Sequence, residues 1–355
     1  MMKLEEIIAG IKPLEQEWIQ KAQGRTARLV MPTRALGRLH EISERLCGIQ
    51  QTLQPNVDHK AILVMAGDHG VVAEGVSAYP QEVTPAMVQT FLVGGAGINA
   101  IARQVGADVW VVDMGIIPEL DATGLKGAER LVVEKIGNGT ASFARGPAMS
   151  RQDAERTLQV GFEQASRRVE NGAEILGTGD MGIGNTTPSA AIGAVISGAS
   201  LDEMVGRGTG VDDAGLARKR DIVRRGIEVN TPQPEDGLDV LAKVGGFEIG
   251  GIAGTILAAA FHRRAVVVDG FISTAGALVA RALCPTVKDY LFAGHCSEEA
   301  GHRIMLKHLG LEPILDLGMR LGEGTGAALA MGVMDSAVRM FKEVLTFQEA
   351  GVADK

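Results

Sequence analysis

Residues 177–187 combine a glycine-dense turn with side chains that form hydrogen bonds, directly before an apolar helical pattern over 186–197. Glycine permits positive φ and close approach to a ligand, and the N–H groups and dipole at a helix N-terminus attract an anion. The pattern predicts a phosphate-binding turn, although an ordinary strand-to-helix turn fits equally well. Its glycines, and the polar residues that could cap the helix, are Gly177, Gly179, Gly182, Gly184, Asn185, Thr186 and Thr187.

A second glycine turn, Gly208-Thr209-Gly210, precedes a lysine on the next helical pattern. Turns of this kind can present several N–H groups to one anion, and Lys219 could add a point charge to the same phosphate. This lysine stands in the run Arg218-Lys219-Arg220. Because charge runs are usually solvated, the run alone favours an exposed lysine.

A carboxylate, Glu323, stands between Gly322 and Gly324 at the start of a long helical pattern. Burial there would raise its pKa toward the range of a general base, whereas a helix N-terminus would lower it. A catalytic base and a helix-start acid are therefore equally compatible with the sequence. Arg320 could bind a carboxylate or phosphate through two N–H groups, or pair with Glu323.

Two histidine pairings suggest a metal site: His69 beside Asp68, and His295 with His302. Neither has the spacing of a known zinc motif, so a structural or hydrogen-bonded histidine is favoured in each case. Cys296 fits a small buried residue. The chain lacks a Walker A motif and a G-x-S-x-G elbow, and the strand pattern at 108–115 is not followed by G-x-G-x-x-G. These observations argue against nucleoside triphosphates, dinucleotides and serine hydrolysis.

Composition limits the class of protein. The chain has 355 residues, 46% of them hydrophobic, and a net charge of −8 with only 4% aromatic residues, which argues against nucleic-acid binding. Three widely spaced cysteines form neither a disulfide framework nor a metal motif. The N-terminus carries acidic residues where a signal peptide needs an apolar run, and we expect no membrane span. A cytoplasmic protein is predicted.

Hydrophobic periodicity predicts the elements that position these residues. Helices are expected at 4–22, 36–53, 85–104, 150–171, 186–197, 216–229, 236–244, 250–262, 272–284, 297–309 and 324–344. Short apolar runs at 61–66, 108–115, 131–133, 173–177 and 265–270 are typical of buried parallel strands. Strands that alternate with helices predict a doubly wound, mostly parallel α/β sheet, with ligands beyond the carboxyl ends of the strands.

Several motifs, in this order along the chain, resemble nicotinate-nucleotide–dimethylbenzimidazole phosphoribosyltransferases. They are Leu36-Gly-Arg-Leu39, Ala66-Gly-Asp-His-Gly-Val71, Gly146-Pro-Ala-Met-Ser150, Asn185-Thr-Thr-Pro188, Lys243-Val-Gly-Gly-Phe247, Val268-Asp-Gly-Phe271 and Arg320-Leu-Gly-Glu-Gly-Thr-Gly-Ala-Ala-Leu-Ala330. The resemblance implies a Rossmann-like catalytic domain at 55–326 and a small helical domain built from 1–54 with 327–355. It also implies a homodimer.

The same resemblance implies transfer of 5-phosphoribosyl from nicotinate mononucleotide to 5,6-dimethylbenzimidazole, in cobalamin biosynthesis. Glu323 would be the general base, with Asp180 as a second catalytic carboxylate. Phosphate and ribose would be bound by Gly182, Gly184, Asn185, Thr186, Gly208, Thr209, Gly210, Lys219, Ser297 and Arg320. The acceptor, 5,6-dimethylbenzimidazole, would contact Ser77, Tyr79, Met87 and Met181. The pyridinium of the donor is already a good leaving group, so the chemistry requires no metal and no cofactor.

Some residues depart from the family pattern. Met31-Pro-Thr-Arg-Ala-Leu-Gly37 replaces the common Lys-Pro-Pro-Gly-Ser-Leu-Gly, and Asp180 replaces a longer glutamate. Tyr79 and Met87 stand where some relatives carry smaller or polar residues, so adenine, phenols and other benzimidazoles remain possible acceptors. Two different functions also remain open, a phosphate-binding isomerase or kinase and a non-catalytic sensor of nicotinate mononucleotide.

Overall fold

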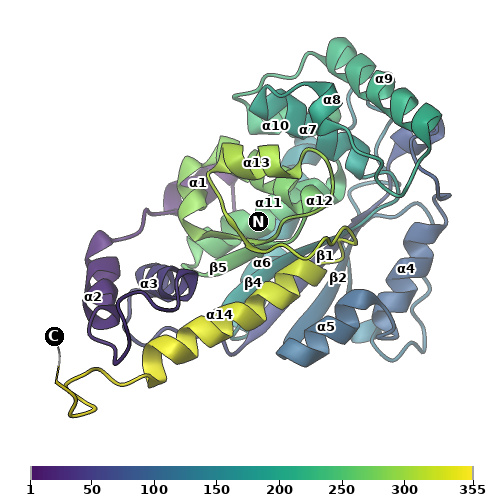
Figure 1. The fold of residues 1–355 in the computed structure, drawn as a ribbon. Coiled ribbons are helices and arrows are strands. Elements are labelled where there is room, and N and C mark those ends of the chain that lie inside the picture. Colours follow the sequence, from purple (N-terminus) through teal and green to yellow (C-terminus); the bar gives the residue numbers. More distant parts are fainter. Residues whose placement is uncertain (1, 354–355) are drawn as a thin grey trace.

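A computed structural model describes residues 2–353 and contains one seven-stranded parallel sheet (Figure 1). The strand order is β3-β2-β1-β4-β5-β6-β7. The strands are β1 (Lys60–Gly67), β2 (Ala107–Gly115), β3 (Leu131–Val133), β4 (Ile175–Met181), β5 (Ala265–Val268), β6 (Leu291–His295) and β7 (Pro313–Leu315). This order confirms the predicted doubly wound α/β sheet and is that of a Rossmann-like fold, with its topological switch point between β1 and β4.

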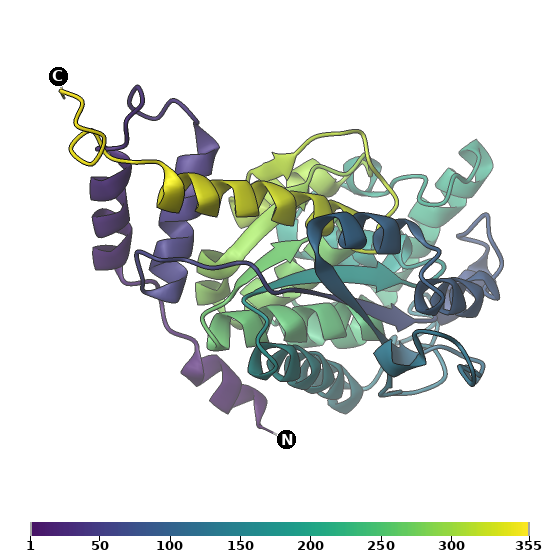
Figure 2. The ribbon, with the colours of Figure 1, turned by 90° about the horizontal axis from the view of Figure 1, so that it is seen from below.

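Helices cover both faces of the sheet (Figure 2). α11 and α12 pack on one face, and α5 and α14 on the other. The helices are α1 (Leu4–Gly10), α2 (Gln16–Thr26), α3 (Arg38–Gln50), α4 (Val83–Leu92), α5 (Gly97–Val105), α6 (Arg151–Glu170), α7 (Thr186–Ser197), α8 (Leu201–Met204), α9 (Asp213–Asn230), α10 (Gly237–Val244), α11 (Phe247–Phe261), α12 (Phe271–Leu283), α13 (His302–Leu309) and α14 (Thr325–Glu343). Because both faces are covered, every residue of β1 is buried.

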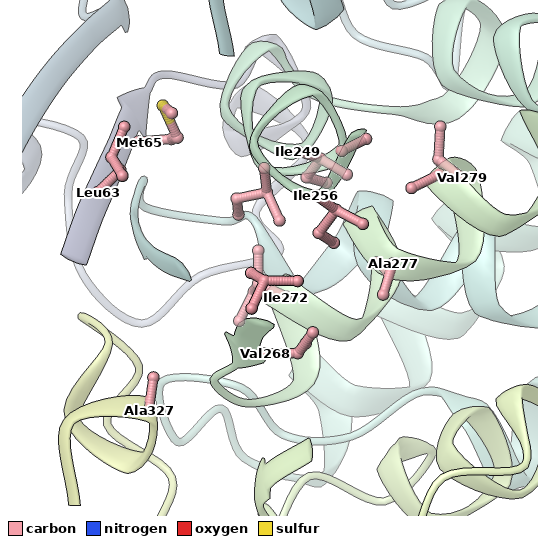
Figure 3. Close-up of a cluster of buried hydrophobic side chains, with 14 of the residues drawn as sticks. Leu63, Met65, Ile249, Ile256, Val268, Ile272, Ala277, Val279 and Ala327 are labelled. Atoms are coloured by element: carbon pink, nitrogen blue, oxygen red, sulfur yellow. The ribbon is translucent and has the colours of Figure 1, made fainter. Parts of the chain in front are cut away.

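One large core cluster joins the sheet to these helices. Figure 3 shows part of it, with Leu63 of β1, Ile256 of α11, Val268 of β5, Val279 of α12 and Ala327 of α14. These are small or branched apolar residues, which explains how a chain with few aromatic residues fills its interior. The core holds the carboxyl ends of the strands, and the loops that follow them, in fixed positions.

The sequence predictions differ from the structure at several elements. The helix predicted at 4–22 is interrupted between α1 and α2, where Pro13 cannot continue a helix. The helix predicted at 297–309 begins only at His302. Strands β6 and β7 were not predicted: β6 has only three apolar residues before Gly294 and His295, and β7 begins at Pro313 and has three residues. The strand predicted at 173–177 extends to Met181, so part of the predicted glycine turn belongs to β4.

The helix predicted at 85–104 is also two helices, α4 and α5. Residues 83–105 are long and apolar enough to cross a membrane by length and composition alone, with a mean hydropathy of 1.3. Gly94 lies between the two helices with φ of 79°. Each helix is consequently much shorter than the roughly 20 residues that a membrane span requires.

The two ends of the chain lie against each other. α2 packs on α3, and α3 on α14. Arg25 donates to the carbonyl oxygen of Phe341, and Leu29 forms an antiparallel bridge with Thr346. α1 instead contacts α11 of the large sheet. The division into 1–54 with 327–355 and 55–326 stays a prediction, and residues 1, 354 and 355 lie outside the described residues.

Candidate active site

A pocket of about 430 Å³ lies at the carboxyl ends of β4, β5 and β6, beside the switch point of the sheet. Most of the predicted site residues line it: Tyr79, Met87, Asp180, Met181, Gly182, Asn185, Thr186, Gly208, Thr209, Ser297, Arg320 and Glu323. Segments that are more than 240 residues apart in sequence thus meet in one pocket, because each follows the end of an element that the sheet anchors.

The remaining predicted residues lie next to this lining. Lys219 Nζ donates to Thr186 Oγ1 at 2.7 Å, and the Ser77 hydroxyl lies 3.4 Å from that of Thr209. Gly184 and Gly210 have φ of 88° and 104°, respectively, so both occupy turns that an L side chain would strain. We call Lys219, Thr186, Gly208 and Thr209 the phosphate end of the pocket.

Lys219 is buried, with 1% of its surface exposed. Successive helical residues point roughly 100° apart, so Lys219 faces α7 while Arg218 beside it is exposed. Burial lowers the pKa of Lys219 to about 8, while the carboxylate of Glu299 acts in the opposite direction. The interpretation of Lys219 as a solvated lysine is therefore wrong. A charged group buried beside a hydroxyl is suited to bind an anion.

The glycine turn before α7 differs from the prediction in two ways. Gly177 and Gly179 are strand residues without positive φ, and a Cβ on Gly179 would lie only 2.6 Å from the carbonyl oxygen of Glu323. These glycines serve close packing. In addition, no side chain caps α7, and Asn185 instead donates to Asp180 Oδ2 at 2.9 Å. The N-terminus of α7 consequently has no side-chain cap that would compete with a ligand.

Glu323 lies in a left-handed backbone conformation, with φ of 63°, between two glycines that also have positive φ. Its side chain is buried, and Oε2 accepts a hydrogen bond from the N–H of Ile98 at 3.1 Å. Burial raises the pKa of Glu323 and the charge of Asp269 raises it further, while the Ile98 hydrogen bond opposes them. The raised pKa favours the general base over the helix-start acid.

Asp269, which follows β5, holds the Glu323 loop in place. Its Oδ2 accepts the N–H of Gly324 at 3.1 Å, and its Oδ1 accepts those of Gly326 at 2.7 Å and Ala327 at 2.9 Å. Asp269 therefore caps α14 and fixes the backbone directly after Glu323. Sequence reasoning did not assign this role to Asp269, although an acid directly after a buried strand was a usable signal.

Asp180 lies close to Glu323 in the same pocket. Only its Oδ2 has a partner, while its buried Oδ1 has none among the described residues. Burial raises the pKa of Asp180 well above its ordinary value, and the charges of Asp269, Glu248 and Glu323 raise it further, against the hydrogen bond from Asn185. Asp180 therefore holds a proton more firmly than an ordinary carboxyl group.

The histidines divide into two groups. His69 forms a 2.8 Å hydrogen bond with Glu248, and His302 accepts the N–H of Ser297 at 2.7 Å, which confirms the prediction of hydrogen-bonded histidines. His295 differs, because neither of its ring nitrogens has a hydrogen-bond partner within residues 2–353. No group of three His, Cys, Asp or Glu that could hold a metal ion occurs in this described part of the chain.

Three large side chains, those of Tyr79, Met87 and Met181, line the pocket together with Glu323, and we call these four residues the base end. Tyr79 is 55% exposed and lies at the mouth. Arg320 also lines the pocket and forms no ion pair with Glu323 in the described structure, so that predicted pairing is absent.

Sequence reasoning missed other lining residues. They are Val83, Ile183, Gly270, Phe271, Ile272, Glu299, Leu321 and Gly322. His295 also lines the pocket, although only a metal-binding or structural role was considered for it. The helix start at 270–272 follows a predicted strand, and the polar loop 294–299 contains Glu299, so their positions in the topology could have indicated both.

Comparisons with known proteins agree with this geometry. The model of a family described as "Phosphoribosyltransferase" matches residues 11–352. The nicotinate-nucleotide–dimethylbenzimidazole phosphoribosyltransferases of Geotalea uraniireducens and Geobacter sulfurreducens are each 52% identical over 354 residues, which is 100% of this chain and 99% of each relative.

A solved structure of the enzyme with this name from Thermus thermophilus superimposes with a TM-score of 0.90 at 45% identity, and the match covers 96% of this chain and 100% of that one. Family model, relatives and solved structure all match nearly the whole length of the chain. The chain therefore belongs to the family of nicotinate-nucleotide–dimethylbenzimidazole phosphoribosyltransferases.

Proposed function

We propose that the chain transfers 5-phosphoribosyl from nicotinate mononucleotide to 5,6-dimethylbenzimidazole in cobalamin biosynthesis, which yields α-ribazole 5′-phosphate and nicotinate. One observation carries this assignment from the site itself. A single pocket holds a buried carboxylate of raised pKa, Glu323, and a phosphate end built around the buried Lys219. A base that accepts a proton and a sugar phosphate that supplies C1′ would thus meet in one cavity.

The phosphate end binds the 5′-phosphate of the donor. Lys219 supplies charge, and Thr186 at the start of α7 supplies its hydroxyl group and its backbone N–H, which together bind a dianion away from bulk water. Gly208 and Gly210 keep the neighbouring turn in left-handed conformations close to the ligand. Ser297, held by His302, adds a further hydroxyl on the β6 side of the pocket.

The reaction is an in-line displacement at C1′. One ring nitrogen of the benzimidazole attacks C1′, and the bond from C1′ to the pyridinium nitrogen breaks, so that its electron pair leaves with neutral nicotinate nitrogen. Attack from the opposite face converts the β configuration to α. Glu323 accepts the proton of the other ring nitrogen, which leaves the benzimidazole of the product neutral. Binding and orientation supply most of the remaining acceleration.

Asp180 supports this step as a protonated partner. Two neighbouring carboxyl groups whose environments differ can divide the roles of proton holder and proton acceptor. The pKa of Asp180 is raised by burial and by three neighbouring carboxylates, against one for Glu323, so Asp180 keeps its proton while Glu323 remains free to accept one. A protonated Asp180 can donate its O–H to the substrate from its unpaired side.

The base end accepts a flat bicyclic ring. Tyr79 can stack on one face, and the thioethers of Met87 and Met181 adapt to rings of different size. Benzimidazoles suit this surface best because they also present an N–H to Glu323. Adenine and phenols remain acceptors to be compared directly.

We further infer a homodimer in the cytoplasm. Tyr79, Leu317 and Leu321 are 55%, 61% and 60% exposed, and Tyr79 and Leu321 line the pocket, so a second copy that covers them would also close the site. The three cysteines are free, which suits a reducing compartment. Light scattering of the purified protein measures the oligomeric state, and a monomer at working concentration would contradict this assignment.

The function is tested by incubation of the purified protein with nicotinate mononucleotide and 5,6-dimethylbenzimidazole, with both products followed by chromatography. Equimolar nicotinate and ribosylated base are expected. Parallel reactions with adenine and with a phenol establish the preferred acceptor. Tight nucleotide binding without product from any acceptor would contradict the transferase and favour a nucleotide sensor.

A further inference from the structure

Glu74 is a largely buried carboxylate that lies outside the pocket lining. It ends the short 3₁₀ helix Gly70–Glu74 after β1, and 10% of its side chain is exposed. Its Oε1 accepts hydrogen bonds from Ser142 Oγ at 3.1 Å and Arg145 Nε at 2.8 Å. Its Oε2 accepts one from Arg225 Nη2 at 2.8 Å. Two cations and a hydroxyl group therefore engage both oxygens of this carboxylate.

The groups that bind Glu74 belong to two segments that are joined without it. Arg225 lies on α9, and the other two donors lie in the turn 142–145. Phe143 of this turn is buried, and Asn230 of α9 donates to its carbonyl oxygen at 2.7 Å. We call α9 and the turn 142–145 the platform. Removal of Glu74 should leave the platform in place, because its own contacts do not involve that side chain.

Glu74 is also an anchor of the segment that follows it, 75–79, which we call the acceptor turn. Within this turn the side chain of Val76 is buried in the core, and Thr209 Oγ1 accepts a backbone N–H at 3.2 Å. Tyr79, at the end of the turn, is 55% exposed, so little packing holds its ring. The position of that ring therefore depends on how firmly the anchors hold the turn.

The charge of Glu74 suits attachment better than proton transfer. Burial raises the pKa of Glu74, but the hydrogen bonds from Arg225, Ser142 and Arg145 outweigh burial and hold the pKa below its ordinary value. A carboxylate of lowered pKa is a poor general base. Glu74 consequently stays ionised near neutral pH and keeps its contacts with the platform.

We propose that Glu74 is a positioning residue that fixes the acceptor turn against the platform and so holds Ser77 and Tyr79 ready for the acceptor. This inference rests on the proposed function, because it concerns how the same pocket binds its second substrate. A turn that is ordered in advance loses less conformational entropy when a ligand binds. Loss of the Glu74 contacts should therefore weaken acceptor binding and leave nucleotide binding largely unchanged.

The first test measures KM for each substrate, with the other saturating, in wild type and in Glu74→Ala. KM for 5,6-dimethylbenzimidazole should rise by about 10-fold, because the turn carries two acceptor contacts, and KM for nicotinate mononucleotide should change by less than about twofold. Glu74→Gln keeps the shape of the side chain and should restore part of the loss. Equal rises in both KM values, or a fall in kcat alone, would overturn the inference.

Glu163→Ala is the matched control for this test. It removes an ion pair of the same length, 2.8 Å between Glu163 and Arg167 on α6, and Glu163 does not line the pocket. Neither KM should change in this variant. A rise in acceptor KM as large as that of Glu74→Ala would show that the loss of any ion pair has this effect, and would contradict a specific role of Glu74.

Arg225→Met tests the same contact from the platform, and serves equally if Glu74→Ala does not fold. Arg225 is 48% exposed, so its replacement should not disturb the interior. KM for the acceptor should rise less than in Glu74→Ala, because two partners of the carboxylate remain. Combined with Glu74→Ala, Arg225→Met should cause no further rise, since both changes remove one interaction. Fully additive effects would contradict the proposal.

Calorimetric titration of 5,6-dimethylbenzimidazole, in the presence of ribose 5-phosphate, separates this inference from the proposed function. The Kd of the acceptor should be about 10-fold higher in Glu74→Ala than in wild type. An unchanged Kd would refute the positioning role, whatever the turnover. A wild type that binds the acceptor but releases no nicotinate in the chromatographic assay would count against the proposed function alone.

Discussion

The two ends of the pocket use buried charge in different ways. At the phosphate end, Lys219 is already hydrogen-bonded to Thr186, and its pKa of about 8 leaves it largely charged near neutral pH. At the base end, Glu323 accepts a single backbone N–H, and burial together with the charge of Asp269 raises its pKa. Lys219 thus offers a positive charge to an anion, whereas the raised pKa of Glu323 suits this side chain to accept a proton.

This difference follows from the elements that carry the two residues. Lys219 projects from the middle of α9, where helical geometry alone directs it toward α7. Glu323 belongs to a loop with three successive left-handed residues, 322–324, and Asp269 holds this loop by accepting the N–H groups that follow Glu323. The proposed phosphate ligand Lys219 is therefore carried by a helix, and the proposed base Glu323 by a loop that tertiary hydrogen bonds hold in place.

The strongest test of the base end is Glu323→Gln. The amide keeps the shape of the side chain but cannot accept the benzimidazole proton, so turnover should fall by about 10²- to 10⁴-fold. Affinity for nicotinate mononucleotide, measured by calorimetry, should stay nearly unchanged because the phosphate end is intact. Wild-type turnover in this variant would remove Glu323 from the mechanism.

At the phosphate end, Lys219→Ala should act mainly on binding. Loss of a charge-assisted hydrogen bond should raise KM for the nucleotide by about 10- to 100-fold, with a smaller change in kcat. Arg218→Ala, on the exposed neighbour, is the matched control and should leave KM close to wild type. If the lysine variant lost kcat and kept KM, binding and catalysis would not be divided between the two ends.

Asp269→Asn tests how the base end is adjusted. Turnover requires deprotonated Glu323, so the rate rises with pH through the pKa of Glu323. The charge of Asp269 raises that pKa, and its removal should move the acid limb of the kcat profile to lower pH. The weaker cap on α14 should also cost about 1 kcal/mol of stability.

The control for this variant is Asp113→Asn. Asp113 is also buried and accepts the N–H groups of Gly115 and Ile116, but it does not line the pocket. The Asp113→Asn variant should unfold at a lower temperature than wild type. The acid limb of its kcat profile should stay at the pH of wild type. An acid limb that stays in place in Asp269→Asn would limit Asp269 to a structural role.

Local patterns predicted the fold well, because helices and strands follow short-range periodicity. The parallel sheet, its loops at the carboxyl ends and the long helix at 324–344 were expected from apolar spacing, and α14 occupies Thr325–Glu343. The failures involve segments too short for a period, such as β7, and breaks within apolar runs, such as the turn between α4 and α5.

The site was harder to derive from the residues alone. A charge run suggested that Lys219 is exposed, because residue type does not reveal which face of a helix is covered. Gly179 was assigned to a phosphate-binding turn, but it lies in β4, where a side chain would collide with the carbonyl of Glu323. The hydrogen bonds of Asp269 join residues 55 to 58 positions apart, which no local pattern displays.

The smallest expected effect concerns Tyr79 at the mouth of the base end. Its ring is 55% exposed, so stacking on a bound base should contribute only about 1 kcal/mol, which corresponds to roughly a fivefold change in affinity. Tyr79→Ala should therefore raise KM for the acceptor by about that factor and leave KM for the nucleotide unchanged. Val133→Ala, which removes an equally exposed side chain from the edge strand β3, should change neither. If Tyr79→Ala raised KM for the nucleotide more than KM for the acceptor, the acceptor would bind elsewhere in the pocket. That result would contradict the division of the pocket into a phosphate end and a base end.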